Sequence, residues 1–397
     1  MRAILAAALV AMSATLPAAA AVDLLTAPLG PAQRYIVGFH EAPTYRVGDE
    51  YEGNPIVAVD GDLRFVVVET NDPATLEVRA RLDDRVRYLE WDNPQAAFLD
   101  HVPNDARYGD AGHWGSKKIG AQTAWDRTLG STAIKVATID SGLKKTHEDI
   151  AGARVLQGYD FVNNDNDPND QGSACSYHGS HTAGTAGATI NNAKGIAGIS
   201  QHAILPVKVF YPYLIYCTSS TTALVNGLKY AGDQGAHVSS NSWGSSASST
   251  ALNDAVQYAH GKGTIHVAAA GNSGSCTNCV SYPWKDKGSV VIVVSATTSS
   301  DGFASFSSQG PQVDVAAPGV GILSVDGAGT TGYRLMDGTS MAAPHVSGTA
   351  ALIKALNPSF TFAQVEGRIT GTAVDLGTAG KDDRFGYGRL NAAAAVY

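Results

Sequence analysis

The feature that most constrains this chain is a regular alternation of short apolar runs and helical patterns between residues 133 and 356. Strand-like runs cover residues 133–139, 204–210, 238–242, 264–270 and 290–295, and helical patterns cover 221–234, 249–261 and 341–356. Strands that alternate with helices form βαβ units, whose parallel strands are buried on both faces. The sequence therefore predicts an α/β domain, and reactive side chains are expected at the carboxyl ends of its strands.

The N-terminal part of the 397-residue chain has a different composition. Residues 22–95 carry 7 basic and 14 acidic residues, a net charge of −7, whereas residues 96–397 have a net charge of only −2. Strand-like segments at 34–39, 63–68 and 86–90 and a helix-like segment at 74–84 predict a small α+β unit over 22–95. No basic cluster is present, which argues against nucleic acid as a main partner.

The first 21 residues resemble a secretory signal. Arg2 precedes an apolar stretch over residues 4–16, Pro17 interrupts it, and residues 18–21 offer an A-x-A cleavage site. The alternative is a membrane anchor, but an apolar run this short spans a bilayer poorly, and no later segment reaches roughly 20 apolar residues. We expect a secreted protein without a stable membrane anchor.

The four cysteines are Cys175, Cys217, Cys276 and Cys279. An even number in an exported protein favours disulfides, and four cysteines allow three pairings. The Cys276/Cys279 pair could form half of a zinc site, but no second pair follows at the right spacing. A redox role is also disfavoured, because this pair lies in a Gly/Ser-rich loop and does not begin a helix.

Two segments carry candidate acid–base groups. Asp140 directly follows the apolar run at 134–139, where a carboxylate either forms a turn or has a chemical role. His178 and His181 lie one helical turn apart among small residues. Their spacing could suit a metal, but no Glu completes a metalloprotease motif, so His181 is expected to be a buried structural residue.

Two further segments carry a hydroxyl and an amide. Ser340 lies where a loop enters the apolar helix at 341–356. It could be an ordinary N-cap. Alternatively, its hydroxyl could lie beside the first amides of the helix, which would stabilise an oxyanion. Asn272 lies between glycines after the run at 264–270, as either a turn residue or an amide donor.

The combination of these segments is more informative than each one alone. The chain order Asp140, His178, Ser340 is the order described for subtilisin-like serine proteases. Four blocks resemble the signature blocks of that family, with features of its thermitase-like branch: Asp140-Ser-Gly, His178-Gly-Ser-His-Thr-Ala-Gly, Ala-Ala-Gly-Asn272 and Gly-Thr-Ser340-Met-Ala-Ala-Pro. The resemblance spans about residues 105–395. It implies a three-layer α/β fold with a central, mostly parallel sheet over residues 96–397.

The resemblance also implies residue roles in a serine endopeptidase acting on proteins or peptides. Ser340 would be the nucleophile, His178 the general base and Asp140 its orienting partner, while Asn272 and the Ser340 amide would bind the oxyanion. The residues implied to bind substrate are Ser242, Trp243, Gly244, Gly271 and Ser281. The last two line the primary specificity pocket and are uncharged, so apolar or aromatic side chains would be preferred, and the Tyr282–Pro283 bond would be cis.

Structural calcium is a further implication, at one or two sites. The first implied ligand set is Asp105, Asp149, Ile190, Asn192, Lys194 and Ile196, and the second is Asp160, Asp165 and Asp167. Oxygen ligands from loops suit a hard cation. For the second set, a solvated turn is the alternative interpretation. The resemblance further implies the disulfide pairs Cys175–Cys217 and Cys276–Cys279.

The segment 22–95 resembles the family's propeptide, which assists folding and inhibits the enzyme until it is cleaved. The implied product is a monomer that matures by cleaving its own precursor. One alternative is a sedolisin-type peptidase, which would need Glu at the position of His178 and an acidic pH optimum. The other is a catalytically inactive relative that binds peptides.

Overall fold

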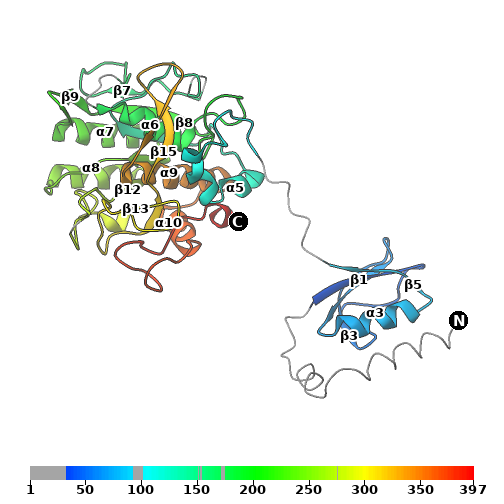
Figure 1. The fold of residues 1–397 in the computed structure, drawn as a ribbon. Helices are drawn as coiled ribbons and strands as arrows, with labels where there is room; N and C mark the ends of the chain where they lie inside the picture. The colour runs from blue at the N-terminus through cyan, green and yellow to red at the C-terminus, as the bar shows by residue number, and fades with distance from the viewer. Residues whose placement is uncertain (1–32, 93–101, 151, 153, 171–174, 275) are drawn as a thin grey trace. The chain divides into compact units, whose positions relative to one another are not determined.

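The computed structural model describes residues 33–92, 102–150, 152, 154–170, 175–274 and 276–397 (Figure 1). The chain divides into two compact units, one ending at Ala97 and the other beginning at Phe98. The predicted signal at 1–21 and the predicted junction near residue 95 lie outside the described residues. In the part that is described, no helix is long and apolar enough to cross a membrane.

Over residues 33–92, the N-terminal unit is an antiparallel sheet with one helix. Its five strands lie in the order β2-β3-β4-β1-β5. Their bounds are β1 Gln33–Phe39, β2 Glu50–Tyr51, β3 Asn54–Asp60, β4 Phe65–Thr70 and β5 Val86–Trp91, and helix α3 covers Pro73–Leu82. Leu76 and Ala80 of α3 are buried with apolar residues of the strands, such as Val37 and Val66, so this unit has a hydrophobic core of its own.

The larger unit is built on a seven-stranded sheet in the order β14-β13-β12-β11-β6-β8-β7, in which every pairing is parallel. The strands are β6 Lys135–Asp140, β7 Tyr159–Asp160, β8 Ala203–Lys208, β11 Val238–Asn241, β12 Ile265–Ala269, β13 Val291–Thr297 and β14 Val315–Pro318. The strand order changes direction around β6, because β11 flanks it on one side and β8 on the other. The predicted α/β class with a central parallel sheet is confirmed.

Helices cover both faces of this sheet, as expected for strands that are apolar throughout. One core joins the sheet to α9 (Thr339–Leu356), α5 (Ala121–Arg127) and α10 (Phe362–Gly371). A second core joins the opposite face to α7 (Thr221–Asp233) and α8 (Thr250–Gly261). The result is the three-layer architecture, with α6 (His178–Gly187) packed against α9 (Figure 1).

Local sequence explains where the predicted helices begin. The side chains of Ser220 and Ser249 accept hydrogen bonds from backbone amides in the first turns of α7 and α8, as N-caps do. The sequence patterns did not indicate two hairpins. These are β9 (Tyr211–Tyr213) with β10 (Tyr216–Thr218), and β15 (Ile322–Asp326) with β16 (Gly332–Met336). The remaining short elements are η1 Ala111–His113, α4 Trp114–Lys118, η3 Gly288–Val290 and α11 Ala392–Ala395.

Candidate active site

An aspartate and a histidine meet at the carboxyl end of the central strand β6. Asp140 is the last residue of β6 and His178 is the first residue of α6. Nδ1 of His178 lies 2.8 Å from Oδ1 of Asp140, and the two side chains are 22% and 4% exposed. Burial by itself lowers the pKa of His178, but the charge of Asp140 and the hydrogen bond outweigh it, so the pKa is raised. The pair therefore favours a protonated imidazole.

Close packing brings α6 to this position. A Cβ atom on Gly179 would lie 2.2 Å from the carbonyl oxygen of Gly142, so only glycine lets the helix approach the end of β6. The neighbouring His181 is fully buried and its Nε2 lies 3.0 Å from the carbonyl oxygen of Ile322. Burial lowers the pKa of His181 to about 3, so it stays neutral. Its position agrees with the structural role expected for it.

Ser340 lies in the first turn of α9, next to the residue that follows β11. Its hydroxyl donates a hydrogen bond of 3.1 Å to the carbonyl oxygen of Ser242, whose own hydroxyl donates to the Ser340 carbonyl at 2.8 Å. Ser242 and His178 line the same cavity of about 180 Å³. Ser242 thus links the serine and the histidine, although no hydrogen bond joins Ser340 to His178 in the described chain.

Two hydrogen-bond donors converge beside Ser340. A Cβ atom on Gly338 would lie 3.5 Å from Asn272 Nδ2 and 3.5 Å from the Ser340 backbone nitrogen. Asn272 Oδ1 accepts from the amide and the hydroxyl of Thr339, both at 3.0 Å, which leaves its Nδ2 as the outward donor. The Thr339 hydroxyl also accepts from the Gly271 amide. The sequence motifs do not reveal this positioning role of Thr339, and its place between Gly338 and Ser340 is the one signal for it.

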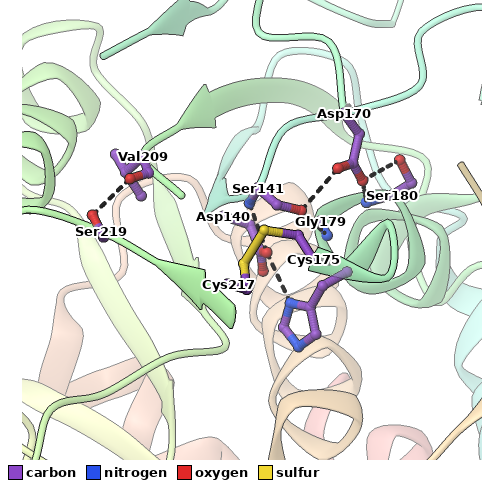
Figure 2. Close-up of a disulfide and its surroundings, with 10 residues drawn as sticks. Asp140, Ser141, Asp170, Cys175, Gly179, Ser180, Val209, Cys217 and Ser219 are labelled. Atoms are coloured by element: carbon purple, nitrogen blue, oxygen red, sulfur yellow. Dashed lines mark hydrogen bonds and ion pairs between the residues drawn. A yellow bond between two sulfur atoms is a disulfide. The ribbon is translucent and has the colours of Figure 1, made fainter. Parts of the chain in front are cut away.

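A second carboxylate, also missed from the sequence, holds the start of α6. Asp170 is buried and accepts hydrogen bonds from the Ser141 hydroxyl at 2.9 Å and from the amide and hydroxyl of Ser180 at 2.9 and 2.7 Å (Figure 2). Ser141 in turn accepts from the Gly179 amide. Burial raises the pKa of Asp170. Asp170 follows the acidic stretch at 160–167, for which the resemblance implies a calcium site, and no local sequence pattern indicates that it is buried.

The residues expected to form the specificity pocket lie together. A Cβ atom on Gly271 would lie 2.4 Å from Ser281 Oγ, and one on Gly244 would lie 2.3 Å from Ser281 Cβ. Trp243 is 8% exposed and packs against Trp284, with ring centroids 4.7 Å apart. The Tyr282–Pro283 bond is cis, as the resemblance implied. These contacts bring the uncharged residues Gly244, Gly271 and Ser281 together, beside the residue that follows Ser242.

Both disulfides pair as the resemblance implied. Cys175 bonds to Cys217, which joins the segment before α6 to strand β10 (Figure 2). Cys276 bonds to Cys279 within the loop that follows Asn272. The described residues contain no free cysteine.

Four residues of the first implied calcium set lie together: Asp105, Asp149, Asn192 and Ile196. Asp149 is fully buried and accepts from Asn192 Nδ2 at 2.8 Å and from the Ile196 amide at 2.9 Å. Burial raises the pKa of Asp149 to about 7, and the nearby charge of Asp105 contributes. Asp105 accepts from the Asn191 amide, which ties it to the same loop. Two buried carboxylates close to each other fit a divalent cation, because it would offset both burial and their repulsion.

The second implied set is arranged differently. Asp160 is fully buried and forms a salt bridge of 2.8 Å with Lys208, which is itself 5% exposed. Asp165 and Asp167 are exposed, and Asp165 accepts from the Asp167 amide. In the described ranges, no group of three or more His, Cys, Asp or Glu side chains is arranged to hold a metal ion. The charge of Asp160 is therefore balanced within the protein.

A carboxylate–imidazole pair, a nearby serine at a helix start and two converging donors at the carboxyl edge of a parallel sheet are the parts of a serine hydrolase site. Comparisons with known proteins agree with this class. The model of the subtilase family matches residues 131–388. Thermitase from Thermoactinomyces vulgaris is 41% identical over 298 residues, which cover 75% of this chain and 99% of the relative.

Two further matches extend the comparison. Subtilisin E from Bacillus subtilis (strain 168) is 37% identical over 376 residues, covering 92% of this chain and 90% of the relative. A solved protease structure from Pseudoalteromonas arctica PAMC 21717 has a TM-score of 0.63 and 31% identity, and covers 74% of this chain and 98% of that one. The chain belongs to the subtilase family. It is a subtilisin-like serine endopeptidase, whose substrates are polypeptides.

Proposed function

We propose that this endopeptidase cleaves peptide bonds with Ser340 as nucleophile, His178 as general base and Asp140 as its orienting partner. The observation that carries the proposal is the 2.8 Å contact between His178 Nδ1 and Asp140 Oδ1. Because Asp140 accepts from Nδ1–H, the neutral imidazole has its lone pair on Nε2, the nitrogen that faces away from Asp140. The Ser340 hydroxyl must rotate from its bond to Ser242 to donate to Nε2.

The reaction then follows from these positions. Ser340 Oγ attacks the substrate carbonyl carbon while its proton moves to His178 Nε2, and the carbonyl oxygen becomes an oxyanion. Asn272 Nδ2–H and the Ser340 amide donate to that oxyanion. When the C–N bond breaks, His178 returns the proton to the leaving amine. Water repeats the sequence on the acyl-enzyme and regenerates Ser340.

The uncharged surroundings of Gly271 and Ser281 support a preference for apolar or aromatic side chains at the residue before the cleaved bond. A buried charge without a partner is costly, so lysine or arginine would bind poorly in such a pocket. Cleavage-site mapping on casein tests this preference. Frequent cleavage after lysine or arginine would contradict it.

Maturation is part of the same proposal. Residues 1–21 would direct export, and the unit within 22–95 would assist folding and inhibit the enzyme until it is removed. The compact core around Val37, Val66 and Leu76 supports an independently folded segment. The mature enzyme would be a secreted monomer whose charge is close to neutral.

The test of the catalytic assignment is Ser340→Ala in the full-length chain. The variant is expected to remain a precursor and to lose casein hydrolysis, because it has no nucleophile. N-terminal sequencing, intact mass and size-exclusion chromatography of the secreted product measure processing and oligomeric state. A Ser340→Ala variant that processes itself and hydrolyses casein at the wild-type rate would refute the proposal.

Structural calcium completes the proposal. Asp105, Asp149, Asn192 and the loop carbonyls of Ile190, Lys194 and Ile196 would hold one ion, which would tie the segment around Asp105 to the loop at 190–196. A bound ion supplies positive charge to two buried carboxylates and no catalytic step. A second ion near Asp160, Asp165 and Asp167 stays a prediction from the sequence.

A further inference from the structure

The hairpin of β9 and β10 exposes an unusual run of apolar side chains. Tyr213, Leu214, Ile215 and Tyr216 are 60%, 81%, 80% and 65% exposed. We call these four residues the hairpin tip. Residues 209–220, which include the whole hairpin, contain no charged residue. Adjacent exposed apolar side chains of this size are typical of binding surfaces, whereas single ones need no explanation.

The turn itself does not explain the choice of residues. Leu214 has a φ of +55°, a left-handed conformation that favours glycine, asparagine or aspartate in a two-residue hairpin. A leucine there costs conformational energy and also exposes its side chain. The choice of leucine at this position is therefore consistent with a contact outside the hairpin.

The base of the hairpin is fixed beside the catalytic histidine. Cys217 of β10 is bonded to Cys175, which lies three residues before His178. The Ser219 hydroxyl donates to the Val209 carbonyl at 2.6 Å, which closes the hairpin from the other side (Figure 2). Cys217 also pairs with Pro212 across the two strands. These ties hold the apolar tip at a set place relative to His178.

The hairpin is continuous with the catalytic cavity. That cavity of about 180 Å³ is lined by Asp140, Cys175, His178, Phe210, Cys217, Ser242 and Trp243. Phe210 leads into β9 and faces Trp243, with ring centroids 6.3 Å apart. Leu214 is three residues from Cys217, in the two-residue turn that joins β9 to β10. A polypeptide bound at Ser340 and extended past this wall would reach the tip several residues from the cleaved bond.

We propose that the hairpin tip is an accessory binding surface for apolar residues of the substrate polypeptide, beyond those that enter the catalytic cavity. This inference rests on the proposed endopeptidase function. The lack of charge on the hairpin favours aliphatic and aromatic partners. It disfavours an anionic lipid surface, which attracts basic residues. The enzyme would thus prefer unfolded chains, in which apolar segments are accessible.

The test compares peptides that differ only far from the cleaved bond. Fluorogenic peptides share the residues around that bond and carry either leucine and phenylalanine or serine about five to seven positions away, on one side or the other. The enzymes are wild type, Leu214→Asn, Ile215→Thr, the double variant and, as a matched control, Val374→Thr, which changes an exposed apolar residue elsewhere. Leu214→Asn suits the left-handed turn, so it is expected to fold.

We expect wild type to cleave one apolar peptide with a kcat/KM about fivefold to tenfold above that of its serine partner, from burial of a few apolar groups. Each single hairpin variant should reduce this ratio and the double variant should bring it near one, while Val374→Thr keeps it. A tetrapeptide anilide, too short to reach the tip, should be cleaved equally by all five enzymes.

Three results would overturn the inference. Wild type could show no preference for either apolar peptide, or the double variant could keep the wild-type ratio. The double variant could also keep the ratio and lose only binding to phosphatidylcholine/phosphatidylglycerol vesicles, which would make the tip a lipid-binding surface. Failure of the proposed function looks different, because hydrolysis of the tetrapeptide anilide would then survive in Ser340→Ala.

Discussion

Two buried aspartates, nine residues apart in the sequence, differ in what balances their charge. Asp140 has the imidazole of His178 at 2.8 Å. Asp149 accepts hydrogen bonds from neutral donors, among them Asn192 and the Ile196 amide, and burial and the nearby carboxylate of Asp105 raise its pKa to about 7. No salt bridge to Asp149 is present in the described ranges. The protein supplies the partner of one carboxylate, and the other is suited to an ion from solution.

This difference separates activity from stability. In the proposed mechanism the charge of Asp140 acts on a group that must gain and lose a proton, so its removal should impair the reaction. The charge of Asp149 would act through the proposed calcium ion, so its removal should mainly weaken the fold. Asp160 provides a reference, because Lys208 already balances it.

The largest expected effect is at the catalytic aspartate. Asp140→Asn should lower kcat by roughly 10⁴-fold, because an amide at this place favours the wrong imidazole tautomer. Asp149→Asn should change kcat less than about threefold, well inside the tenfold that 1.4 kcal/mol represents. The precursor of each variant is first matured with wild-type enzyme, which is then removed, and the concentration of active sites is titrated. Initial rates on a tetrapeptide anilide then give kcat for both variants. Similar losses in the two variants would break the contrast.

The next largest effect is expected at Asn272, a proposed donor to the oxyanion, which the fold holds in place before substrate binds. Asn272→Ala should lower kcat about 100- to 1,000-fold, the loss known for one oxyanion donor in subtilisin. Thr339→Ala should cost less, because Thr339 only orients Asn272, and should leave KM nearly unchanged. Steady-state kinetics on the same anilide measure kcat and KM for both variants. A larger loss in Thr339→Ala than in Asn272→Ala would contradict the positioning role.

The calcium region should respond to chelation. A ligand at 100 times its Kd stabilises the folded state by about 2.7 kcal/mol, which for a domain of about 300 residues is about 4 °C in Tm. Excess EDTA should lower the Tm of wild type by that amount and leave Asp149→Asn unaffected. Scanning calorimetry with and without calcium measures it.

Asp160→Asn is the matched control for that experiment. It removes a buried partner of Lys208, so its Tm should be low with or without calcium. The difference between its Tm with calcium and its Tm in EDTA should equal that of wild type. A reduced difference would instead indicate a second ion near Asp160, Asp165 and Asp167. An unchanged wild-type Tm in EDTA would remove the calcium proposal.

The smallest effect is a shift in pH dependence. Asp140 raises the pKa of His178, and His178 must be neutral to accept the serine proton. kcat/KM should therefore increase with pH through this pKa. Removal of the Asp140 charge lowers the pKa, so the residual activity of Asp140→Asn should show its rising limb at lower pH. A rising limb at the same or higher pH would mean that Asp140 does not set this pKa.

The central sheet and the main candidate site residues could be predicted from the sequence, because both depend on patterns of neighbouring residues. The apolar runs became β6, β8, β11, β12 and β13 with ends shifted by one or two residues. Asp140, Asn272 and Ser340 each lie within two residues of a glycine, in a compact block that needs tight turns. Such blocks can be recognised without knowledge of the rest of the chain.

The parts that were missed depend on contacts between distant segments. Asp170 and Thr339 look like ordinary loop and cap residues until Ser180 and Asn272 are placed beside them. Lys208 lies within an apolar strand, and its pairing with Asp160 follows from the parallel register of β7 and β8. The short strands β9 and β10 lack the length that a strand pattern needs for recognition.

The site is assembled from the ends of β6, β11 and β12 and from the first turns of α6 and α9. A chain that has formed only half of its sheet has no complete active site. Copies that misfold would then be inert as enzymes, and their exposed apolar segments would make them substrates for correctly folded neighbours. Activity would thus be limited to molecules in which the whole sheet has formed.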